Sequence, residues 1–469
     1  MSSLARIKQR MVFDVPVITM SPMRIASGMD DGLTDILILK NKKGQALVPG
    51  TSLAGVLRTA VASIYNEAVA DKIFGSIADN GNQSMINIGD IVLTGSQLVH
   101  RDGVAIDTFT GVGINGAKYD YEAIDRDAQG NLTIELTVRE NDVEHAPNIG
   151  LVHKNMTDLY QDVAATIADL LTGGIHLGSL TAKGYGRLAS KKEAGYLLFD
   201  FSTAKAVDNW LAYLDKKCAL QPAYKGNTQA IATSSAEDFI LEADFALESF
   251  LIVRDFEEAA ERSTADNKLA AVQMKSGKDF VIPGTSVKGV VRNRCTKIVT
   301  ALCQGDEAKA KEFIKPLMGY AEEKTGVAMK SRLMVDEIYI NKDDAKPMKH
   351  SRNRINRFTG GTEDGALFTE EVIRQQNKDT ATVKLRLRIN NCAKAEAGLL
   401  LLVLKDLWLG KLSFGGGKSI GRGVLTGKAC TVKYAGEDIK FTSSGYVEDA
   451  YARELLEGYV QELVVKCNG

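Results

Sequence analysis

Several residue types and patterns are scarce in this chain of 469 residues, and each shortage narrows the class of protein. The six cysteines are scattered without a CxxC spacing, which argues against a zinc site and a disulfide framework and is typical of a reducing cytosol. Only five histidines leave few candidates for histidine-based catalysis. No apolar run approaches the ~20 residues that span a bilayer, and the N-terminus lacks the apolar core of a signal peptide. We therefore expect a cytoplasmic protein without a membrane partner.

The overall charge balance does not mark the chain as a nucleic-acid binder. Lys+Arg (58) and Asp+Glu (59) give a net charge of −1, so any basic surface must be local. Hydrophobic residues make up 45% and charged residues 25% of the chain, as in ordinary globular proteins. Glycine (43) greatly outnumbers proline (8), so turns are made mainly by glycine.

The chain repeats itself. Residues 48–58 read VPGTSLAGVLR and residues 282–292 read IPGTSVKGVVR, at an offset of 234. Two more pairs follow in the same order: IDTFTG (106–111) with INRFTG (355–360), and GSLTAKGYGRL (178–188) with SFGGGKSIGRGVL (413–425). Three blocks in one order at a nearly constant offset indicate two homologous domains.

The coarse secondary structure predicts an α+β fold in each copy. Opening strands, alternating strands and amphipathic helices occur in an order that a ferredoxin-like strand–helix–strand–strand–helix–strand core accommodates. Each PGTS block opens a helix, with Thr51 or Ser52 and Thr285 or Ser286 as the expected N-caps. The predicted parts are a first domain at 1–200, a linker at 201–236, a second domain at 237–435 and a C-terminal helical tail at 436–469.

The PGTS blocks are candidate phosphate-binding elements, because a helix N-terminus carries partial positive charge and unpaired N–H donors. A well-capped helix that serves only packing is the alternative. The candidate RNA-binding residues are Ser52 and Arg58 in the first copy and Ser286, Lys288, Arg292 and Arg294 in the second.

The late glycine-rich loops combine close backbone approach with Lys183 and Arg187 in the first copy and Lys418 and Arg422 in the second. Glycine-rich loops with cations suit a polyanion, whereas the Walker A spacing is missing. The alternative is a β-turn with solvated cations.

The stretch 346–361, KPMKHSRNRINRFTGG, interleaves cations such as Arg352 and Arg354 with Phe358. Cations next to an aromatic ring suit single-stranded nucleic acid, whose phosphates they neutralise while a base stacks. The first copy offers Phe109 at the same place. A solvated charged face is the alternative.

The PGTS block, the TG element followed by GA-x-(Y/F)-x-x-E (Gly116–Glu122 and Gly365–Glu371) and the late glycine-rich loop together resemble the RAMP superfamily. The likeness is strongest to the backbone subunit of type III CRISPR–Cas effector complexes, with two copies fused as in type III-D-like systems. This resemblance implies an RRM-like core in each copy, a β-hairpin thumb after the TG element, and CRISPR RNA, target single-stranded RNA and other effector subunits as partners.

The resemblance also implies that an aspartate in the loop before the PGTS block cleaves the target RNA. Asp35, fourteen residues before Pro49, lies at that position, with Asp31 close by. Asp266, seventeen residues before Pro283, is the counterpart if a short insertion is allowed. Asp35 and Asp266 would hold Mg²⁺ near the scissile phosphate. The alternatives are a turn at Asp31 and a surface carboxylate at Asp35.

Three other functions stay open at this point. The chain could be a non-catalytic scaffold that binds guide RNA, an endoribonuclease that processes precursor guide RNA, or a tandem ferredoxin-like protein that binds another anion. Processing enzymes of this superfamily commonly use histidine or tyrosine bases, and histidine is scarce here.

Overall fold

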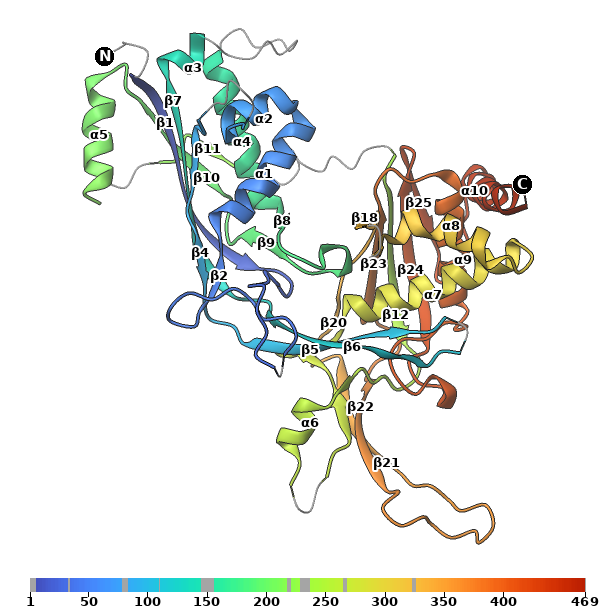
Figure 1. Ribbon diagram of the computed structural model, residues 1–469. Helices are drawn as coiled ribbons and strands as arrows, with labels where there is room; N and C mark the ends of the chain where they lie inside the picture. The colour runs from blue at the N-terminus through green and yellow to red at the C-terminus, as the bar shows by residue number, and fades with distance from the viewer. Residues whose placement is uncertain are drawn as a thin grey trace. The chain divides into compact units, whose positions relative to one another are not determined.

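The structure is a computed structural model that describes residues 6–32, 34–77, 83–108, 110–144, 156–216, 221–227, 237–264, 268–322 and 326–468. The chain divides into two compact units (Figure 1). Unit 1 comprises Met1–Asp102, Tyr119–Thr181 and Tyr185–Thr233, and unit 2 comprises Gly103–Lys118, Ala182–Gly184 and Ser234–Gly469. Each unit has its own sheet and hydrophobic core.

The first repeat is built around one long central strand, β1, because alternate residues from Met11 to Val17 face the core. Its neighbours in the sheet are β7 on one side and β9 and β10 on the other, with β3 beyond β7. The strands are β1 (Ile7–Thr19), β2 (Ala46–Val48), β3 (Ile86–Ile88), β4 (Ile91–Leu93), β5 (Leu98–Ile106), β6 (Gly113–Ile124), β7 (Gln129–Arg139), β8 (Ile175–His176), β9 (Arg187–Ser190), β10 (Gly195–Asp200) and β11 (Tyr224–Lys225). The helices are α1 (Gly50–Ile64), α2 (Glu67–Phe74), α3 (Glu140–Glu144), α4 (Met156–Gly173), η2 (Thr181–Lys183) and α5 (Ala204–Leu214).

The second repeat has the same strand order, β19-β23-β12-β24, with β25 added at the edge. Its strands are β12 (Phe239–Leu247), β13 (Arg254–Asp255), β14 (Ala271–Gln273), β15 (Lys275–Ser276), β16 (Asp279–Ile282), β17 (Tyr320–Glu322), β18 (Val327–Met329), β19 (Leu333–Val335), β20 (Ile338–Ile340), β21 (Ala345–Arg352), β22 (Phe368–Gln375), β23 (Val383–Ile389), β24 (Leu425–Tyr434) and β25 (Glu437–Phe441). The helices are α6 (Glu257–Arg262), α7 (Gly284–Leu302), α8 (Glu307–Met318), α9 (Lys394–Trp408), η3 (Lys418–Ile420) and α10 (Ala450–Asn468). In both sheets the second, third, first and fourth core strands lie side by side, so the predicted α+β fold of two ferredoxin-like repeats is confirmed.

The starts of the two PGTS helices differ from the expected capping. Pro49 and Pro283 occupy the N-cap positions in extended conformations, and neither helix has a side-chain cap from that residue. The prediction that the Thr or Ser hydroxyls cap these helices is wrong, because the helices begin at the glycine directly after the proline. At α1 the carboxylate of Asp90 accepts the Gly50 N–H at 2.8 Å and so fills part of the anion-attracting helix end.

Each repeat carries a hairpin inserted between its second and third core strands: β5–β6 in the first and β21–β22 in the second. Figure 1 shows β21–β22 as a long hairpin that extends away from the sheet of unit 2. The TG elements, Thr110–Gly111 and Thr359–Gly360, lie in the turns of these hairpins. The expected thumbs therefore exist, but the prediction that they follow the TG element is wrong in position, because the element forms the hairpin turn.

Candidate nucleic-acid interface

Asp35 is exposed and lies in the loop between β1 and α1. The next residue, Ile36, forms a parallel bridge with Tyr121 in hairpin strand β6. The backbone N–H of Asp120 donates to Asp35 Oδ2 at 2.9 Å, and Oδ1 has no hydrogen-bond partner within the described ranges. The hairpin strand therefore fixes this carboxylate at the surface while one oxygen stays available.

The strand registers identify the counterpart of Asp35 in the second repeat. There Ala271 pairs in parallel with Glu370 of β22, as Ile36 pairs with Tyr121. The residue before that bridge is Ala270, whose N–H donates to the carbonyl of Thr369 at 2.8 Å. Ala270, thirteen residues before Pro283, thus shares the register of Asp35. Asp266, the counterpart predicted from the sequence, lies outside the described residues.

Asp31 lies four residues before Asp35 and is also exposed. Its Oδ1 accepts the backbone N–H of Thr34 at 2.7 Å, so its carboxylate closes a turn within the loop.

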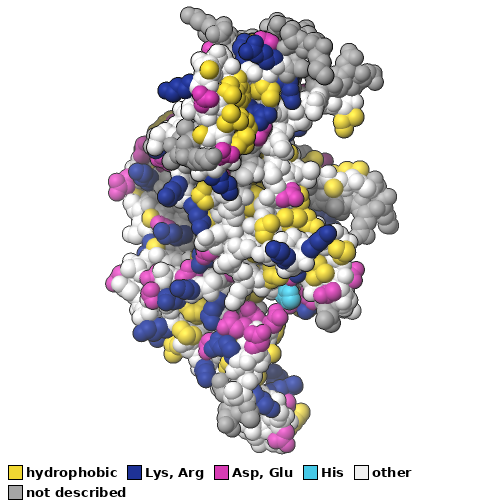
Figure 2. Space-filling view, turned by 90° about the vertical axis from the view of Figure 1, so that its left-hand side faces the viewer, with side chains coloured by type: hydrophobic (Ala, Val, Ile, Leu, Met, Phe, Trp, Pro, Cys, Tyr) yellow, Lys and Arg dark blue, Asp and Glu magenta, His cyan; other side chains and the backbone are white. Residues whose placement is uncertain are grey.

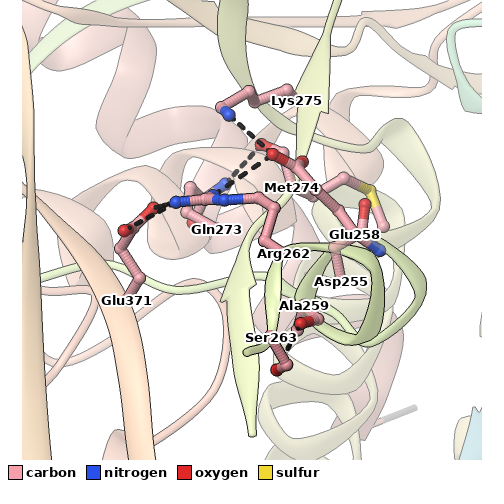
Figure 3. Close-up of polar contacts among 9 residues, drawn as sticks. All are labelled: Asp255, Glu258, Ala259, Arg262, Ser263, Gln273, Met274, Lys275 and Glu371. Atoms are coloured by element: carbon pink, nitrogen blue, oxygen red, sulfur yellow. Dashed lines mark hydrogen bonds and ion pairs between the residues drawn. The ribbon is translucent and has the colours of Figure 1, made fainter. Parts of the chain in front are cut away.

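The second repeat replaces this part of the loop with the short helix α6 and a network of ion pairs (Figure 3). Arg262 donates to both carboxylate oxygens of Glu371 at 2.8 Å and pairs with Glu258 at 3.2 Å. Lys275 pairs with the same Glu258 at 2.7 Å. In the first repeat the corresponding lysine and glutamate contact each other directly: Lys40 Nζ donates to Glu122 at 2.6 Å. The two cations and two carboxylates of the second repeat balance one another and tie α6 to the base of the hairpin.

The late glycine-rich loops can be matched by their tightest glycines. A Cβ on Gly186 would lie 1.9 Å from the carbonyl oxygen of Leu177, and a Cβ on Gly423 would lie 1.8 Å from that of Phe414; both have positive φ. Gly178 and Gly415, each eight residues earlier, make matching close approaches. This register aligns Tyr185 with Arg422. The cations that were matched from the sequence blocks, such as Arg187 and Arg422, therefore do not occupy equivalent positions in the fold.

The aligned residues form different clusters in the two repeats. In the first, the hydroxyls of Tyr121 and Tyr185 lie 3.1 Å apart, and Arg101 donates to Tyr185 at 2.9 Å. In the second, Glu370 and Arg422 occupy the positions of the two tyrosines, and both are 3% exposed.

Three arginines converge on Glu370, and we call Arg254, Arg352 and Arg422 the arginine triad. They donate to the carboxylate of Glu370 at 2.9, 2.6 and 2.6 Å. Burial alone would raise the pKa of Glu370, but the hydrogen bonds and charges of Arg422 and Arg254 lower it to about 2. His350 contacts Arg422 at 3.4 Å, and burial together with Arg422 and Arg352 lowers its pKa, so it adds no charge near neutral pH.

Other candidates on the PGTS helices are engaged within the protein. Arg58 pairs with Glu67 and Asp71 on α2, at 2.9 and 2.6 Å, and Arg294 pairs with Asp406 on α9 at 2.6 Å. Arg292 is exposed and donates to the carbonyl of Gly319 at 3.4 Å. Ser52 and Ser286 are half-buried in the first helical turns.

Lys288 is only 6% exposed, and its ammonium group donates to Ser331 Oγ at 2.6 Å and to the carbonyl of Leu333 at 2.9 Å. Burial lowers the pKa of Lys288 to about 7. This geometry is that of a packed internal lysine, although the sequence proposes it as an RNA contact.

The buried lysine predicts a pH-dependent stability. Because its pKa in the folded chain is lower than the ordinary 10.5, the unfolded chain binds more protons between about pH 7 and 10, and stability rises with pH. We expect the advantage of the wild type over Lys288→Met in free energy of unfolding to grow by about 2–3 kcal/mol from pH 7 to 9.5. Urea unfolding at both pH values measures it, and parallel pH profiles would contradict it.

The remaining candidates spread over loops and hairpins. Lys183 ends η2 and is half-buried, and Arg187 points its guanidinium to the carbonyl of Gly173 at 3.5 Å. Lys418 is exposed in η3. On the second hairpin Arg354 pairs with Glu363, and Phe358 is 99% exposed. Phe109 lies outside the described residues.

Cationic and anionic side chains are interspersed on the face shown in Figure 2. The lower end of that view, where the β21–β22 hairpin lies in Figure 1, carries both signs. Positive charge on this face is therefore confined to local spots, in keeping with the net charge of −1.

Two site residues escape sequence reasoning. Arg254 follows the opening strand in the segment LIVRDF, which carries no motif, and Glu370 is one of two adjacent acids in FTEE. The available signal is the position of Glu370 within the repeated GA-x-(Y/F)-x-x-E element, where the first copy has Tyr121.

A metal site made by protein alone does not occur in the part of the chain that the structure describes, where no three His, Cys, Asp or Glu side chains are grouped closely enough. Mg²⁺ that acts on RNA often uses one or two carboxylates and takes its other ligands from phosphate and water. The single exposed carboxylate of Asp35 fits that mode, whereas Ala270 supplies no ligand.

No helix within the described ranges is long and apolar enough to cross a membrane.

The fold and the hairpins define a tandem ferredoxin-like protein, and its sequence identifies the family. The sequence model of the RAMP superfamily matches residues 17–189 and 233–426, which cover both repeats and most of the chain. The chain belongs to the RAMP superfamily, as two fused copies.

Distant likenesses also occur among solved structures. Among solved structures, the chain is similar to a chain of "Cryo-EM structure of the Type III-B Cmr-beta bound to cognate target RNA", with 14% sequence identity and a TM-score of 0.30. The match covers 40% of this chain and 61% of that chain. No curated protein is significantly similar.

Proposed function

We propose that the chain is a backbone subunit of a type III CRISPR–Cas effector complex. In this role it binds CRISPR RNA along both repeats, contacts other effector subunits and cleaves complementary target RNA at its first repeat. RAMP membership of both halves and the motifs of the first section support the assignment. The observation that carries it is the exposed Asp35 carboxylate, anchored on a hairpin strand.

Binding would rest on backbone contacts and stacking. Phe358 is fully exposed in the turn region of the second hairpin, close in sequence to Arg354 and Arg357. An exposed ring can separate or stack on bases, and neighbouring cations neutralise phosphates without reading sequence.

Cleavage would need little from the protein, because RNA carries its own nucleophile in the 2′-OH. A hairpin that splays one nucleotide out of an A-form duplex allows this hydroxyl to attack in line. Asp35 Oδ1 would orient or accept the proton of the 2′-OH, and the products would be a 2′,3′-cyclic phosphate and a 5′-OH.

Alternatively, Asp35 would be the ligand for Mg²⁺ in the first repeat. The ion, when bound, supplies positive charge that stabilises the developing charge on the scissile phosphate. Asp35 itself holds its place through the Asp120 N–H.

Isolation of the complex that contains this chain tests the proposal. We expect short RNAs with a shared segment and varied guides to co-purify, and we expect unrelated guides to bind with similar affinity. Because counterions are released from the phosphates, the logarithm of the affinity should fall linearly with the logarithm of salt concentration. Absence of RNA, or affinity that does not respond to salt, would contradict the proposal.

One observation favours a second candidate function for half of the chain. Ala270 stands at the register of Asp35, so no carboxylate occupies this register in the second repeat, which fits a non-catalytic RNA-binding scaffold.

A further inference from the structure

The arginine triad carries more positive charge than its surroundings neutralise. Three guanidinium groups share one carboxylate, Glu370. The adjacent acid, Glu371, points to the other face of the strand, where Arg262 occupies both of its oxygens (Figure 3). Glu258 is likewise paired, with Arg262 and Lys275. Glu371 and Glu258 are therefore engaged by other cations, and the triad together with Glu370 has a formal charge of about +2.

The triad is also accessible from one side. Arg422 is buried, whereas the side chains of Arg254 and Arg352 are 36% and 33% exposed. The guanidinium of Arg352 lies 4.7 Å from the ring centre of Phe368, which is itself partly exposed. Gly416 lies against Arg254, since a Cβ there would come within 2.6 Å of its NH1 atom. Planar guanidinium groups can bind the oxygens of a phosphodiester, and the glycine leaves room for it. The aromatic ring can stack on the neighbouring base.

Among the described residues of the first repeat, no carboxylate shared by three arginines lies at this place; Arg24 and Arg101 flank two tyrosines there instead. Its aligned positions hold Tyr121 and Tyr185, next to the loop that carries Asp35. The two repeats thus differ at this place: the second gathers three guanidinium groups around one buried carboxylate, whereas the first has two tyrosine hydroxyls.

We propose that the arginine triad binds a phosphodiester of single-stranded RNA, and that the second repeat grips this strand without cutting it because Ala270 replaces the aspartate. This inference rests on the proposed function and extends it: in each chain the first repeat cleaves the RNA and the second repeat only binds it. The shared carboxylate of Glu370 holds the guanidinium groups together in the absence of RNA.

Affinity measurements on the full-length chain test the grip. The probe is a fluorescent single-stranded RNA of fixed length, titrated at several salt concentrations. We expect Arg254→Gln and Arg352→Gln each to weaken binding about tenfold and to reduce the salt slope by about one. Arg386→Gln is the matched control, because Arg386 is a half-exposed arginine of the same repeat, paired with Glu242. Thermal unfolding confirms that the variants fold.

The outcomes separate this inference from the proposed function. A wild-type chain that binds no RNA would overturn both. If the wild-type chain binds RNA and both triad variants bind it with unchanged affinity, only the proposal that the triad binds RNA is overturned. If the triad variants keep their RNA affinity but lose a protein subunit from the complex, the triad binds an acidic protein surface. This result would also overturn the proposed RNA contact.

A gain-of-function variant tests why the second repeat does not cleave RNA. In the assembled complex, Ala270→Asp is expected to add a second cleavage product to the wild-type pattern. The matched control Ala270→Asn has a similar size and lacks the charge, and it should add none. If Ala270→Asp folds, binds RNA and adds no product, the missing aspartate is not what keeps the second repeat silent.

Discussion

Replacing Asp35 with asparagine is expected to slow target-RNA cleavage by about 100-fold or more in the assembled complex, with guide binding unchanged. Asparagine keeps the size of the side chain and can still accept the Asp120 N–H, so the loop should hold its shape. It removes the negative charge that would accept a proton or bind Mg²⁺. Cleavage of a labelled RNA complementary to the guide, followed on denaturing gels, measures the rate.

The same loop offers matched controls. Asp30→Asn removes an exposed carboxylate that accepts the Gly32 N–H at 3.3 Å, and it should leave the rate unchanged. Asp31→Asn tests the neighbouring candidate, whose carboxylate closes a turn. Because Ala270 takes the register of Asp35, Asp266→Asn should leave the cut pattern intact. Full activity in Asp35→Asn would remove this residue from catalysis and leave the scaffold function.

The second large effect concerns stability. Replacing Glu370 with glutamine is expected to lower the free energy of unfolding of unit 2 by about 3–5 kcal/mol, because it leaves the arginine triad crowded without its shared counter-charge. The chain has two tryptophans, Trp210 in unit 1 and Trp408 in unit 2. Urea unfolding in a Trp210→Phe background therefore reports on the second unit through Trp408 alone.

The size of this effect should depend on pH. The pKa of Glu370 is lowered to about 2, so its contribution is complete above the ordinary value of 4.5 and is lost as the pH falls toward 2. The gap between wild type and Glu370→Gln should narrow over that range. Glu242→Gln is the control, because Glu242 is half-exposed, and its pairing with Arg386 should contribute less than about 1 kcal/mol. Equal midpoints at pH 7 for Glu370→Gln and wild type would contradict the assignment.

The repeat and its core could be predicted because their signals are local. The alternation in 132–138 and 383–389 and the apolar spacing in 156–174 appear in the fold as β7, β23 and α4. The sequence indicated Arg352 and Arg422 one by one, but not that they meet Arg254 at Glu370. The three arginines come from three segments that meet only through the hairpin and the late loop. The caps failed for a smaller reason: the helix begins directly after the proline rather than at the hydroxyl residues.

The loop that carries Asp35 shows why the spacing of residues alone was not enough to find its counterpart in the second repeat. The sequence alignment of Asp266 with Asp35 assumes an insertion before Pro283. The strand bridges instead place a residue thirteen positions before that proline opposite Thr369. The turn between β15 and β16 is one residue shorter than its counterpart in the first copy. A register of this kind depends on pairing with a distant strand, which one sequence does not reveal.

The packing of the last helix has a practical consequence for anyone who produces this protein. A Cβ on Gly398 of α9 would lie 2.2 Å from the carbonyl oxygen of Tyr459 in α10, so the two helices meet backbone to backbone. Leu456, Tyr459 and Leu463 of α10 belong to the core of the second repeat. Shortened versions that end before residue 450 would bare the leucines of α9 to solvent and aggregate, whereas a purification tag attached after residue 469 leaves this seam closed.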